Sequence, residues 1–496
     1  MGIVIKQGSI SGIITYLGAF IGFINSVILF PAFLSTEQVG LLRAIPSIAF
    51  MLLPMVQLGT AQALLKFAPE LKKKSEGIAQ LLGLISLGVL IGAIIVTILI
   101  LGFKGQFIQL FVEKSPLIND YIHVIIALIF IVATYSLFET YSRILLKIIA
   151  MNVIKEILLR LFTSLLVTLY FLQFLSLTQM VNGLILIYAL ALLALVLYIA
   201  YLGELKISFQ LKGLDKDFIK RISNFSLYSM IGASGAYIIL NIDQLMVSSM
   251  LGLDENGIYT TAFFFAIMIE LSKRAILQIT TPLISESFEN GRLDEIQKMH
   301  RQLSINQMIV ASLFFIGIVA NLDNIYALMP NGDAYSLGKN VVIIIGLAKL
   351  IDMTFANNSE IIVMSQYYRF NVITIVCLSG VLVLLNWLFI PIYGIDGAAL
   401  ASLISIFCFN LIKMFFIKWK LKITPFTLGN LKVLVILIVV FSIGYFMPNM
   451  GPALVDALIR SAIITLIFVS LVLIFKVSPE VTGIYRKHIK NRILGL

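Results

Sequence analysis

The chain has 496 residues, of which 60% are hydrophobic and 12% are charged. A soluble domain is about half apolar and about a quarter charged, so this composition excludes an ordinary soluble protein. The formal net charge of +11 does not indicate nucleic-acid binding, because basic loops on one side of a membrane also orient polytopic proteins. We therefore predict an all-α integral membrane protein with no nucleic acid among its partners.

Apolar blocks of roughly 20 residues, the length that crosses ~30 Å of hydrocarbon, predict about fourteen transmembrane helices. In chain order they centre on residues 10–33, 41–64, 79–102, 121–142, 153–175, 180–202, 224–250, 257–284, 303–322, 340–364, 371–391, 396–418, 430–447 and 455–475. Lys and Arg concentrate in alternate loops, as the positive-inside rule requires. The protein is therefore predicted to cross the plasma (inner) membrane many times, with both termini in the cytoplasm.

The longest predicted cytoplasmic connection in the middle of the chain divides it into two halves. The expected organisation is an N-terminal six-helix lobe (1–203), a cytoplasmic linker (204–223), a C-terminal six-helix lobe (224–420), helices 13 and 14 (421–476) and a basic tail (477–496). Ser478 and Pro479 are typical of a helix start. The tail is predicted either to form a basic helix on the anionic leaflet or to be frayed and solvated.

Two short motifs recur in register with the span count. LSTEQVGLL (34–42) is repeated as LGLDENGIY (251–259), where Glu37 precedes Gly40 as Asp254 precedes Gly257. VNGLI (181–185) is repeated as IDGAA (395–399), and the offsets of the two pairs are 217 (254 − 37) and 214 (395 − 181). Because six spans per half is an even number, the repeats are predicted to be parallel, as in transporters with a site between their halves.

Small residues and prolines modify individual spans. Pro46 and Pro54 cannot donate a backbone hydrogen bond, so span 2 is predicted to be kinked. Gly18 and Gly92 each belong to a Gly-xxx-Gly pair, which permits close helix approach. The two cysteines lie in apolar segments and the three histidines are scattered, so the sequence predicts no disulfide, no metal site and no catalytic residues.

The stretch NIDQLMVSSMLGLDENGIYTTA (241–262) resembles the seventh-span signature of polysaccharide flippases of the Wzx type. The matching elements are Asp243, Leu251-Gly252 and Gly257-Ile258-Tyr259. The turn YGIDGAALA (393–401) is similar to the turn between the eleventh and twelfth spans of that family, and the first half matches more loosely. The family belongs to the multidrug/oligosaccharidyl-lipid/polysaccharide exporter superfamily.

This resemblance implies a function and a set of partners. Such proteins move undecaprenyl-diphosphate-linked oligosaccharides, including O-antigen precursors of lipopolysaccharide, from the inner to the outer leaflet. A lipid-linked oligosaccharide, membrane lipids and other polysaccharide-assembly proteins are the partners that the resemblance implies. Similarity to the lipid II flippase branch further implies that the prenyl tail lies along a groove beside spans 13 and 14.

Charged residues occur in the middle of two predicted spans. A charge at the bilayer centre costs ~2.5–3.5 kcal/mol, so these side chains are expected to face the bundle interior or a wet cavity. In span 8 the polar positions lie on one helical face, and they are Glu270, Lys273, Arg274, Gln278 and Thr281. In span 10 they are Lys349, Asp352 and Glu360, with Ala356 on the same predicted face.

The residues proposed to bind substrate combine these charges with polar positions in other spans. They are Lys273, Arg274, Lys349, Glu270, Asp352, Asn241, Asp243, Gln278, Arg43, Gln57 and Asn25. A structural alternative stays open: Glu270 with Lys273 or Arg274, and Lys349 with Asp352 along the helix, would be ion pairs that hold helices together. Asp243 would equally join spans, and an interfacial pair is favoured for Glu139 with Arg143.

Three cations at mid-depth, Lys273, Arg274 and Lys349, favour an anionic cargo, because Arg binds phosphate bidentately and Lys acts as a point charge. The leading hypothesis is a flippase that works by alternating access. A cation-coupled multidrug exporter of the same fold is the alternative, and a polysaccharide polymerase or glycosyltransferase is disfavoured by the short loops. No cofactor is predicted, although Asp243 or Asp352 could bind a coupling Na⁺ or H⁺; membrane potential would serve equally.

Overall fold

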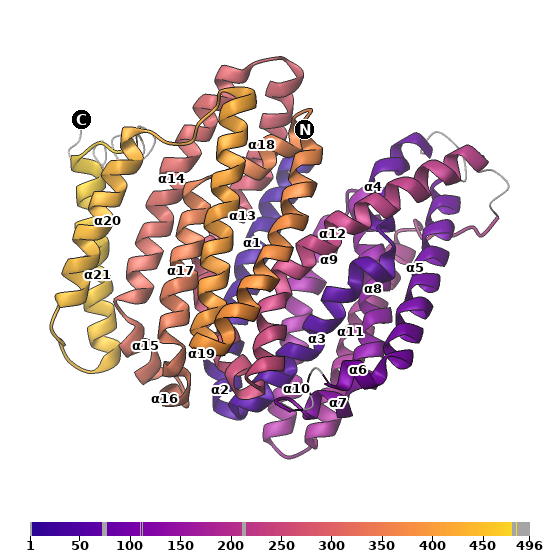
Figure 1. The fold of residues 1–496 in the computed structure, drawn as a ribbon, viewed down its shortest axis with the longest axis horizontal. Coiled ribbons are helices and arrows are strands. Elements are labelled where there is room, and N and C mark those ends of the chain that lie inside the picture. Colours follow the sequence, from indigo (N-terminus) through magenta and orange to yellow (C-terminus); the bar gives the residue numbers. More distant parts are fainter. Residues whose placement is uncertain are drawn as a thin grey trace. The chain divides into compact units, whose positions relative to one another are not determined.

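The computed structural model describes residues 2–71, 77–109, 111, 113–210, 215–478 and 483. Within these ranges every regular element is a helix (Figure 1). The side chains of residues 2–9, 107, 274, 275, 278 and 279 are not described. Most of the predicted basic tail therefore lies outside the described residues, together with the predicted side-chain positions of Arg274 and Gln278.

Up to residue 203, the described residues form eleven α-helices and two π-helices. These are α1 (Gly2–Phe23), η1 (Ile24–Leu29), α2 (Phe30–Phe33), α3 (Thr36–Gln57), α4 (Thr60–Leu71), α5 (Gly77–Gly102), α6 (Lys104–Gln109), α7 (Leu117–Asp120), α8 (Ile122–Ile144), α9 (Ile148–Asn152), η2 (Val153–Leu158), α10 (Leu159–Phe171) and α11 (Leu177–Tyr201).

The remainder forms a second series of helices. These are α12 (Lys216–Met250), α13 (Leu253–Glu289), α14 (Leu293–Val319), α15 (Leu322–Leu328), α16 (Gly332–Tyr335), the 3₁₀-helix η4 (Ser336–Gly338), α17 (Lys339–Thr354), α18 (Asn358–Met364), α19 (Tyr368–Leu421), α20 (Leu428–Phe446) and α21 (Ala453–Ile474).

Each of the fourteen predicted spans coincides with helical structure. Within the described residues, eleven helices are long and apolar enough to cross a membrane by length and composition. One of them, α19, holds two predicted spans that meet at Gly394, whose φ of 58° and ψ of −137° are not helical. The remaining two predicted spans are α13 and the continuous stretch α9–η2–α10. The predicted all-α membrane fold is confirmed.

Several helix starts follow directly from the sequence. Ser35, Ser176 and Thr427 cap α3, α11 and α20, and in each case the third residue of the helix returns a side-chain hydrogen bond to the cap. These reciprocal bonds satisfy backbone donors that the first helical turn leaves free. The loops before these helices, residues 34–35, 172–176 and 422–427, are short, so the chain turns sharply between spans.

Two predicted spans are interrupted by residues that are not helical. Pro46 and Pro54, which were expected to kink span 2, lie inside α3. Span 2 breaks between α3 and α4, where Leu58 and Gly59 have φ angles of 50° and 71°. Span 10 breaks between α17 and α18, where Ala356 has a φ of 52°. A left-handed non-glycine residue costs roughly 1–2 kcal/mol, so tertiary packing must hold Ala356 there. The helix that carries Lys349 and Asp352 ends at Thr354, and Glu360 belongs to the next helix, α18, so the helical spacing that related these positions in the sequence does not hold.

Glycines allow close helix contact in the first part of the chain. A Cβ on Gly18 would lie 2.7 Å from the carbonyl oxygen of Glu156 in η2. A Cβ on Gly92 would lie 2.1 Å from the carbonyl oxygen of Val56 in α3. Side chains larger than hydrogen are excluded at both positions, as the Gly-xxx-Gly pattern predicts.

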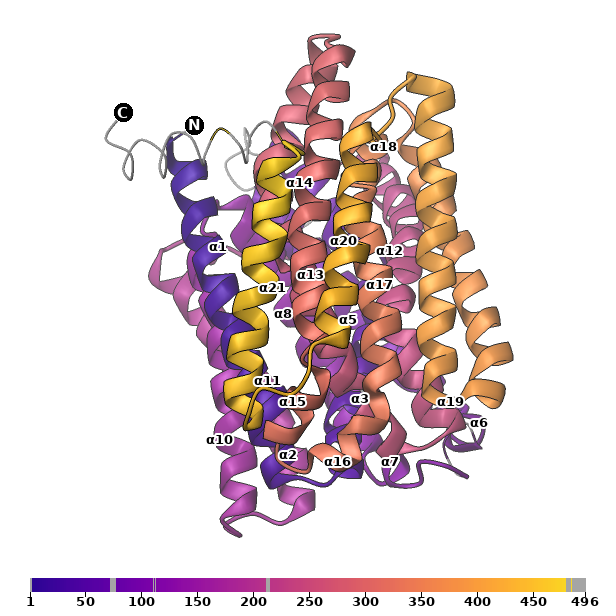
Figure 2. The same ribbon diagram turned by 90° about the vertical axis from the view of Figure 1, so that its left-hand side faces the viewer.

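The chain divides into two compact units. One comprises residues 1–260 and 375–395, and the other comprises residues 261–374 and 396–496. The core of the first unit runs along α3, α5, α8 and α11, with residues such as Ile45, Leu82 and Leu128 fully buried. In the second unit α14, α17, α20 and α21 share a core around Phe315, Val433 and Phe468, with α20 and α21 side by side (Figure 2).

Candidate functional site

The two repeat motifs contact each other within the first unit. Asn256 donates from Nδ2 to the carbonyl oxygen of Gly40 over 3.1 Å, and Thr36 donates from its hydroxyl to Asp254 Oδ1 over 2.5 Å. The start of α3 therefore packs on the start of α13. The repeat seen in the sequence corresponds to a direct contact in the structure.

Four charged side chains from the predicted site meet between α13 and α17. The ammonium of Lys273 pairs with the Asp352 carboxylate, and Lys349 Nζ lies 2.5 Å from Glu270 Oε2. Asn410 of α19 donates from Nδ2 to the second oxygen of Asp352 over 3.0 Å. We call Glu270, Lys273, Lys349 and Asp352 the mid-span charge cluster.

The pairing differs from the one in the structural alternative. That alternative paired Glu270 with Lys273 or Arg274, and Lys349 with Asp352, whereas both observed pairs cross from α13 to α17. Each cross-helix ion pair neutralises one charge on α13 and one on α17, and it also holds the two helices together. The four side chains retain between 14% and 28% of their exposure. They are thus neither fully sealed nor fully exposed to the membrane.

A buried polar network continues from this cluster towards α18. Lys413 of α19 is 1% exposed and donates to Ser359 Oγ over 2.6 Å. Its ammonium also lies 3.7 Å from the centre of the Phe409 ring. Asn357, next to the break at Ala356, donates to Thr280 Oγ1 over 2.8 Å. The burial of Lys413 could have been suspected from the sequence, because this lysine falls inside the predicted span 396–418.

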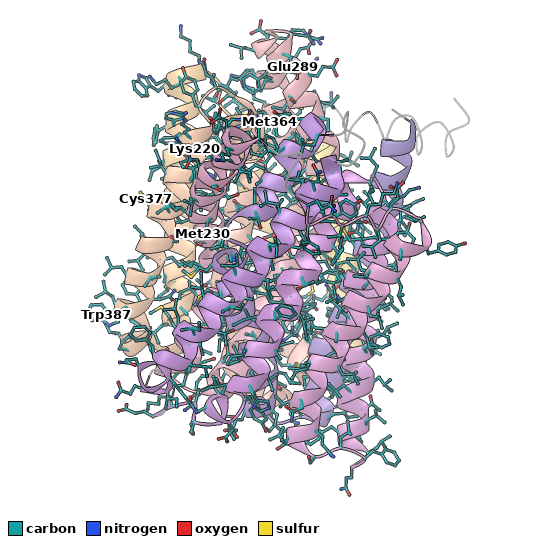
Figure 3. All side chains as sticks on the ribbon, turned by 90° about the vertical axis from the view of Figure 1, so that its right-hand side faces the viewer. Lys220, Met230, Glu289, Met364, Cys377 and Trp387 are labelled. Atoms are coloured by element: carbon teal, nitrogen blue, oxygen red, sulfur yellow. The ribbon has the colours of Figure 1, made fainter. Side chains whose placement is uncertain are left out.

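Asp243 lies in a second polar site, in the first unit. It accepts hydrogen bonds from Asn386 Nδ2 at 2.7 Å and from the Tyr259 hydroxyl at 3.1 Å. Asn386 is fully buried, whereas its neighbour Trp387 projects outward from α19 (Figure 3). Asn386 Oδ1 is buried and has no hydrogen-bond partner among the described residues. A carboxylate beside a free amide oxygen is the donor set that hard cations prefer.

Two further predicted residues donate hydrogen bonds to backbone carbonyl oxygens, Asn241 within its own helix and Gln57 to α8. Asn241 donates to the carbonyl oxygen of Tyr237 one turn earlier, over 2.9 Å. Gln57 is 6% exposed and donates to the carbonyl oxygen of Ala133 over 3.4 Å. Neither is part of the mid-span charge cluster.

The predicted residues Arg43 and Asn25 lie near each other in the first unit. Arg43 donates from Nη2 to Ser26 Oγ over 2.5 Å and stacks over the Phe30 ring. Asn25, in the π-helical turn η1, accepts from Ser164 Oγ over 2.7 Å and donates to the carbonyl oxygen of Arg160 over 3.0 Å. A π-helical turn widens the helix, which places Asn25 against α10.

A small polar pocket lies at the break between α3 and α4. Its volume is about 130 Å³, and its lining includes Gln57, Gln62, Glu139, Arg143 and Lys155. Glu139 Oε1 lies 2.6 Å from Arg143 Nη2 and 2.9 Å from Lys155 Nζ. The predicted pair of Glu139 with Arg143 is confirmed, and Lys155 is a third member that the sequence reasoning missed.

An open groove follows one face of α21. It encloses about 640 Å³ and is lined by Ser461, Ala462, Thr465, Leu466, Val469, Ser470 and Leu473. Small and hydroxyl-bearing residues alternate with aliphatic ones on this face. The groove lies on span 14, beside which the prenyl tail was expected.

The fold is similar to those of solved transporter structures. The lipid II flippase MurJ, in an inward closed conformation, superposes with a TM-score of 0.73 at 15% identity, over 93% of this chain and 98% of that one. An inward-facing multidrug resistance MATE family transporter of the MOP superfamily gives a TM-score of 0.63 at 15% identity, over 84% and 98%. The Vibrio cholerae MATE transporter VcmN in its bent form gives 0.54 at 12% identity, over 85% and 98%. At these identities the likeness concerns the fold.

Sequence comparison identifies the family. No curated protein matches this sequence significantly. Residues 4–288, more than half of the chain, match the family described as polysaccharide biosynthesis protein. That match spans the repeat contact, the pocket at the α3–α4 break, Asp243 and the α13 half of the mid-span charge cluster. The chain belongs to the polysaccharide biosynthesis protein family.

Proposed function

We propose that this protein is a flippase of the plasma membrane. It carries an undecaprenyl-diphosphate-linked oligosaccharide from the cytoplasmic to the outer leaflet by alternating access, for cell-surface polysaccharide biosynthesis. The observation that carries the proposal is the mid-span charge cluster in a chain of this family. Four charges in the middle of membrane helices are costly, and side chains that keep 14–28% exposure can exchange partners with a cargo.

The mid-span charge cluster suits a diphosphate through competition for its cations. Lys273 and Lys349 each hold a carboxylate, and a phosphate oxygen offers the same kind of acceptor with more charge. Arg274, which follows Lys273 in the same span, is a third cation in the sequence, and its side chain is not among those described. On binding, each lysine would exchange its contact with a carboxylate for a contact with a phosphate oxygen, so neither lysine is left without an anionic partner. Release on the outer side would restore the carboxylate pairs.

The remaining parts of the proposal concern the lipid, the coupling ion and orientation. The prenyl tail lies in the groove along α21, where an apolar chain can stay in contact with lipid. Asp243 with Asn386 binds the coupling Na⁺ or H⁺. Asp352 is the less suitable candidate, because its carboxylate is already paired with the ammonium of Lys273, whereas Asp243 accepts hydrogen bonds from neutral side chains. Both termini face the cytoplasm, as the distribution of Lys and Arg predicts.

Single replacements test the cargo site. Lys273→Ala, Arg274→Ala and Lys349→Ala should each abolish glycan export and cause lipid-linked precursor to accumulate, with membrane insertion unchanged. Lys339→Ala is the matched control, because Lys339 pairs with Asp323 at an exposed position. Normal glycan export in all three variants would contradict the proposal that these cations bind the cargo.

A cation-coupled multidrug exporter is the second candidate. The similarity to MATE structures and the oxygen donors at Asp243 favour it. Such an exporter takes cationic cargo and would depend on Glu270 and Asp352 rather than on the lysines. Deleting the gene would then raise drug susceptibility and leave surface polysaccharide unchanged, which is the opposite of the result that the flippase predicts. A polymerase or glycosyltransferase is less well supported, because no long polar loop offers a catalytic site in the described chain.

A further inference from the structure

The pocket at the α3–α4 break has more cationic than anionic side chains, whereas the mid-span charge cluster has two of each. Lys273 and Lys349 each have a carboxylate of their own. Arg143 and Lys155 instead share a single carboxylate, and both contact the same oxygen, Glu139 Oε1. The three side chains together carry one net positive charge. An arrangement of this kind attracts a further anion.

Exposure distinguishes the cations of this pocket from the carboxylate. The side chains of Arg143 and Lys155 are 49% and 45% exposed, whereas that of Glu139 is 9% exposed. Arg has five N–H donors and Lys has three, and each uses one on Glu139. Most of their donors therefore remain open to the pocket or its mouth, while the carboxylate lies beneath them.

The size and the walls of the pocket suit a small anionic group. A volume of about 130 Å³ exceeds the requirement of one water several-fold but is small beside the roughly 300–1,000 Å³ of pockets for drug-sized ligands. Ser136, Thr140 and Tyr237 add hydroxyl groups to the lining. A glycan would not fit, whereas a phosphoryl group would.

The backbone fixes one wall of the pocket. Gly59, which lines it, has a φ of 71°, and a Cβ there would lie 2.0 Å from the carbonyl oxygen of Ser226 in α12. Lys66 of α4 lies over the Phe225 ring of α12, and Arg221 of α12 lies over the Phe67 ring of α4, so α4 is held on α12. The pocket is thus a preformed feature of the first unit rather than a gap between loosely packed helices.

We infer that this pocket is a phosphate site of the protein. Arg143 and Lys155 bind a phosphoryl group of a lipid, and Glu139 is the internal anion that holds the two cations while no phosphate is bound. The inference rests on the proposed flippase function and deepens it. In the proposed orientation the pocket lies in the cytoplasmic half of the membrane, where a lipid-linked precursor would first be captured before it reaches the mid-span charge cluster.

Variants of the three charges are expected to have opposite effects on binding. We would reconstitute the full chain in phosphatidylcholine nanodiscs and measure the affinity for undecaprenyl diphosphate at fixed salt. Arg143→Gln and Lys155→Gln should each weaken binding about tenfold or more, because each removes a charge-assisted contact. Glu139→Gln should strengthen it about three- to tenfold, because it removes the competing anion. Arg160→Gln, whose side chain pairs with Glu156 outside the pocket, should stay within twofold of the wild type.

The sign of the Glu139→Gln effect decides between a phosphate site and a structural ion pair. A structural triad would make all three variants weaker and less thermally stable, and that result would overturn the inference. Should Arg143→Gln fold poorly, Arg143→Lys keeps the charge and should lose only part of the affinity. A second arm replaces undecaprenyl diphosphate with phosphatidylglycerol, and equal affinity for both would assign the site to a structural phospholipid headgroup and overturn the capture role.

The result also separates this inference from the proposed function. Full binding by Arg143→Gln and Lys155→Gln, together with lost binding by Lys273→Ala and Lys349→Ala, would overturn the phosphate site and leave the flippase intact. If the wild-type chain binds no undecaprenyl diphosphate at any concentration tested, the proposed function fails as well.

Discussion

Gly40 and Gly257 occupy equivalent positions in two helices that pack on each other reciprocally. A Cβ on Gly40 would lie 1.9 Å from the carbonyl oxygen of Leu253, and a Cβ on Gly257 would lie 2.1 Å from that of Thr36. The two contacts have the same spacing in the chain, because 257 − 40 and 253 − 36 both give 217. The contact is therefore locally two-fold symmetric, as expected where two copies of a repeated unit meet.

Adding a methyl group at this contact is expected to separate α3 from α13. Gly40→Ala or Gly257→Ala would place a carbon within 3.0 Å of backbone atoms, and backbone cannot rotate away as a side chain can. Both variants should lower Tm and lose glycan export. Thermal unfolding in detergent, followed by size-exclusion chromatography, measures the stability change.

Gly317→Ala is the matched control for this pair. Gly317 lies in α14, and no atom lies within 4 Å of a Cβ built on it. Replacing a helical glycine with alanine gains up to about 1 kcal/mol of helix propensity, so its Tm should stay level or rise. If Gly40→Ala and Gly257→Ala behave like this control, the two helices are not in the close contact described.

The spans and the repeat were predictable because they depend on local rules. Hydrocarbon thickness sets span length, and the two glycine motifs recur at nearly equal offsets of 217 (254 − 37) and 214 (395 − 181). Lys413, Asn386 and the left-handed Ala356 were not predictable in their roles. Asn386 and Asp243 are 143 residues apart, and Ala356 adopts its φ only because surrounding helices impose it. Such contacts depend on tertiary packing, which has no signature in the local pattern.

The same reasoning applies to the charges. An isolated charge is expensive in lipid, so spacing indicated that Glu270, Lys273, Lys349 and Asp352 need partners, and each of them has a partner of opposite charge. Sequence spacing alone does not determine the ion-pair partner of each charge. An opposite charge three or four positions away on the same helix and one on a neighbouring helix are both within reach. The crossed pairing was decided by how α13 and α17 pack.

Exchanging the two charges of one pair distinguishes a structural role from cargo binding. In the double variant Glu270→Lys with Lys349→Glu, the cross-helix pair of α13 and α17 can re-form with opposite polarity. We expect Tm to recover relative to either single variant, because the pair is restored. Glycan export should stay lost, because the cation has moved from α17 to α13. Recovery of export together with Tm would mean that the pair only holds the helices together.

Arg460 and Asp456 are expected to contribute to stability rather than to transport. Arg460 donates to the carbonyl oxygens of Gly444, Met447 and Pro448, which are left free where α20 ends. It also pairs with Asp456 one turn earlier at 3.1 Å. Arg460→Gln should lower Tm more than Lys339→Ala does, while the protein that remains folded exports glycan at the wild-type rate. Loss of export at unchanged Tm would contradict this assignment.

Asp243 is expected to determine ion dependence. Its carboxylate and the partner-free Oδ1 of Asn386 form a small set of oxygen ligands, so Asp243→Asn should remove the response of transport to Na⁺ or to a proton gradient. Tyr259→Phe removes only a 3.1 Å donor to this carboxylate and should retain the response with altered affinity. Transport measured in proteoliposomes under imposed Na⁺ and pH gradients separates the two ions. If Asp243→Asn responds to both gradients as the wild type does, coupling does not use this site, and membrane potential acting on the anionic cargo becomes the better explanation.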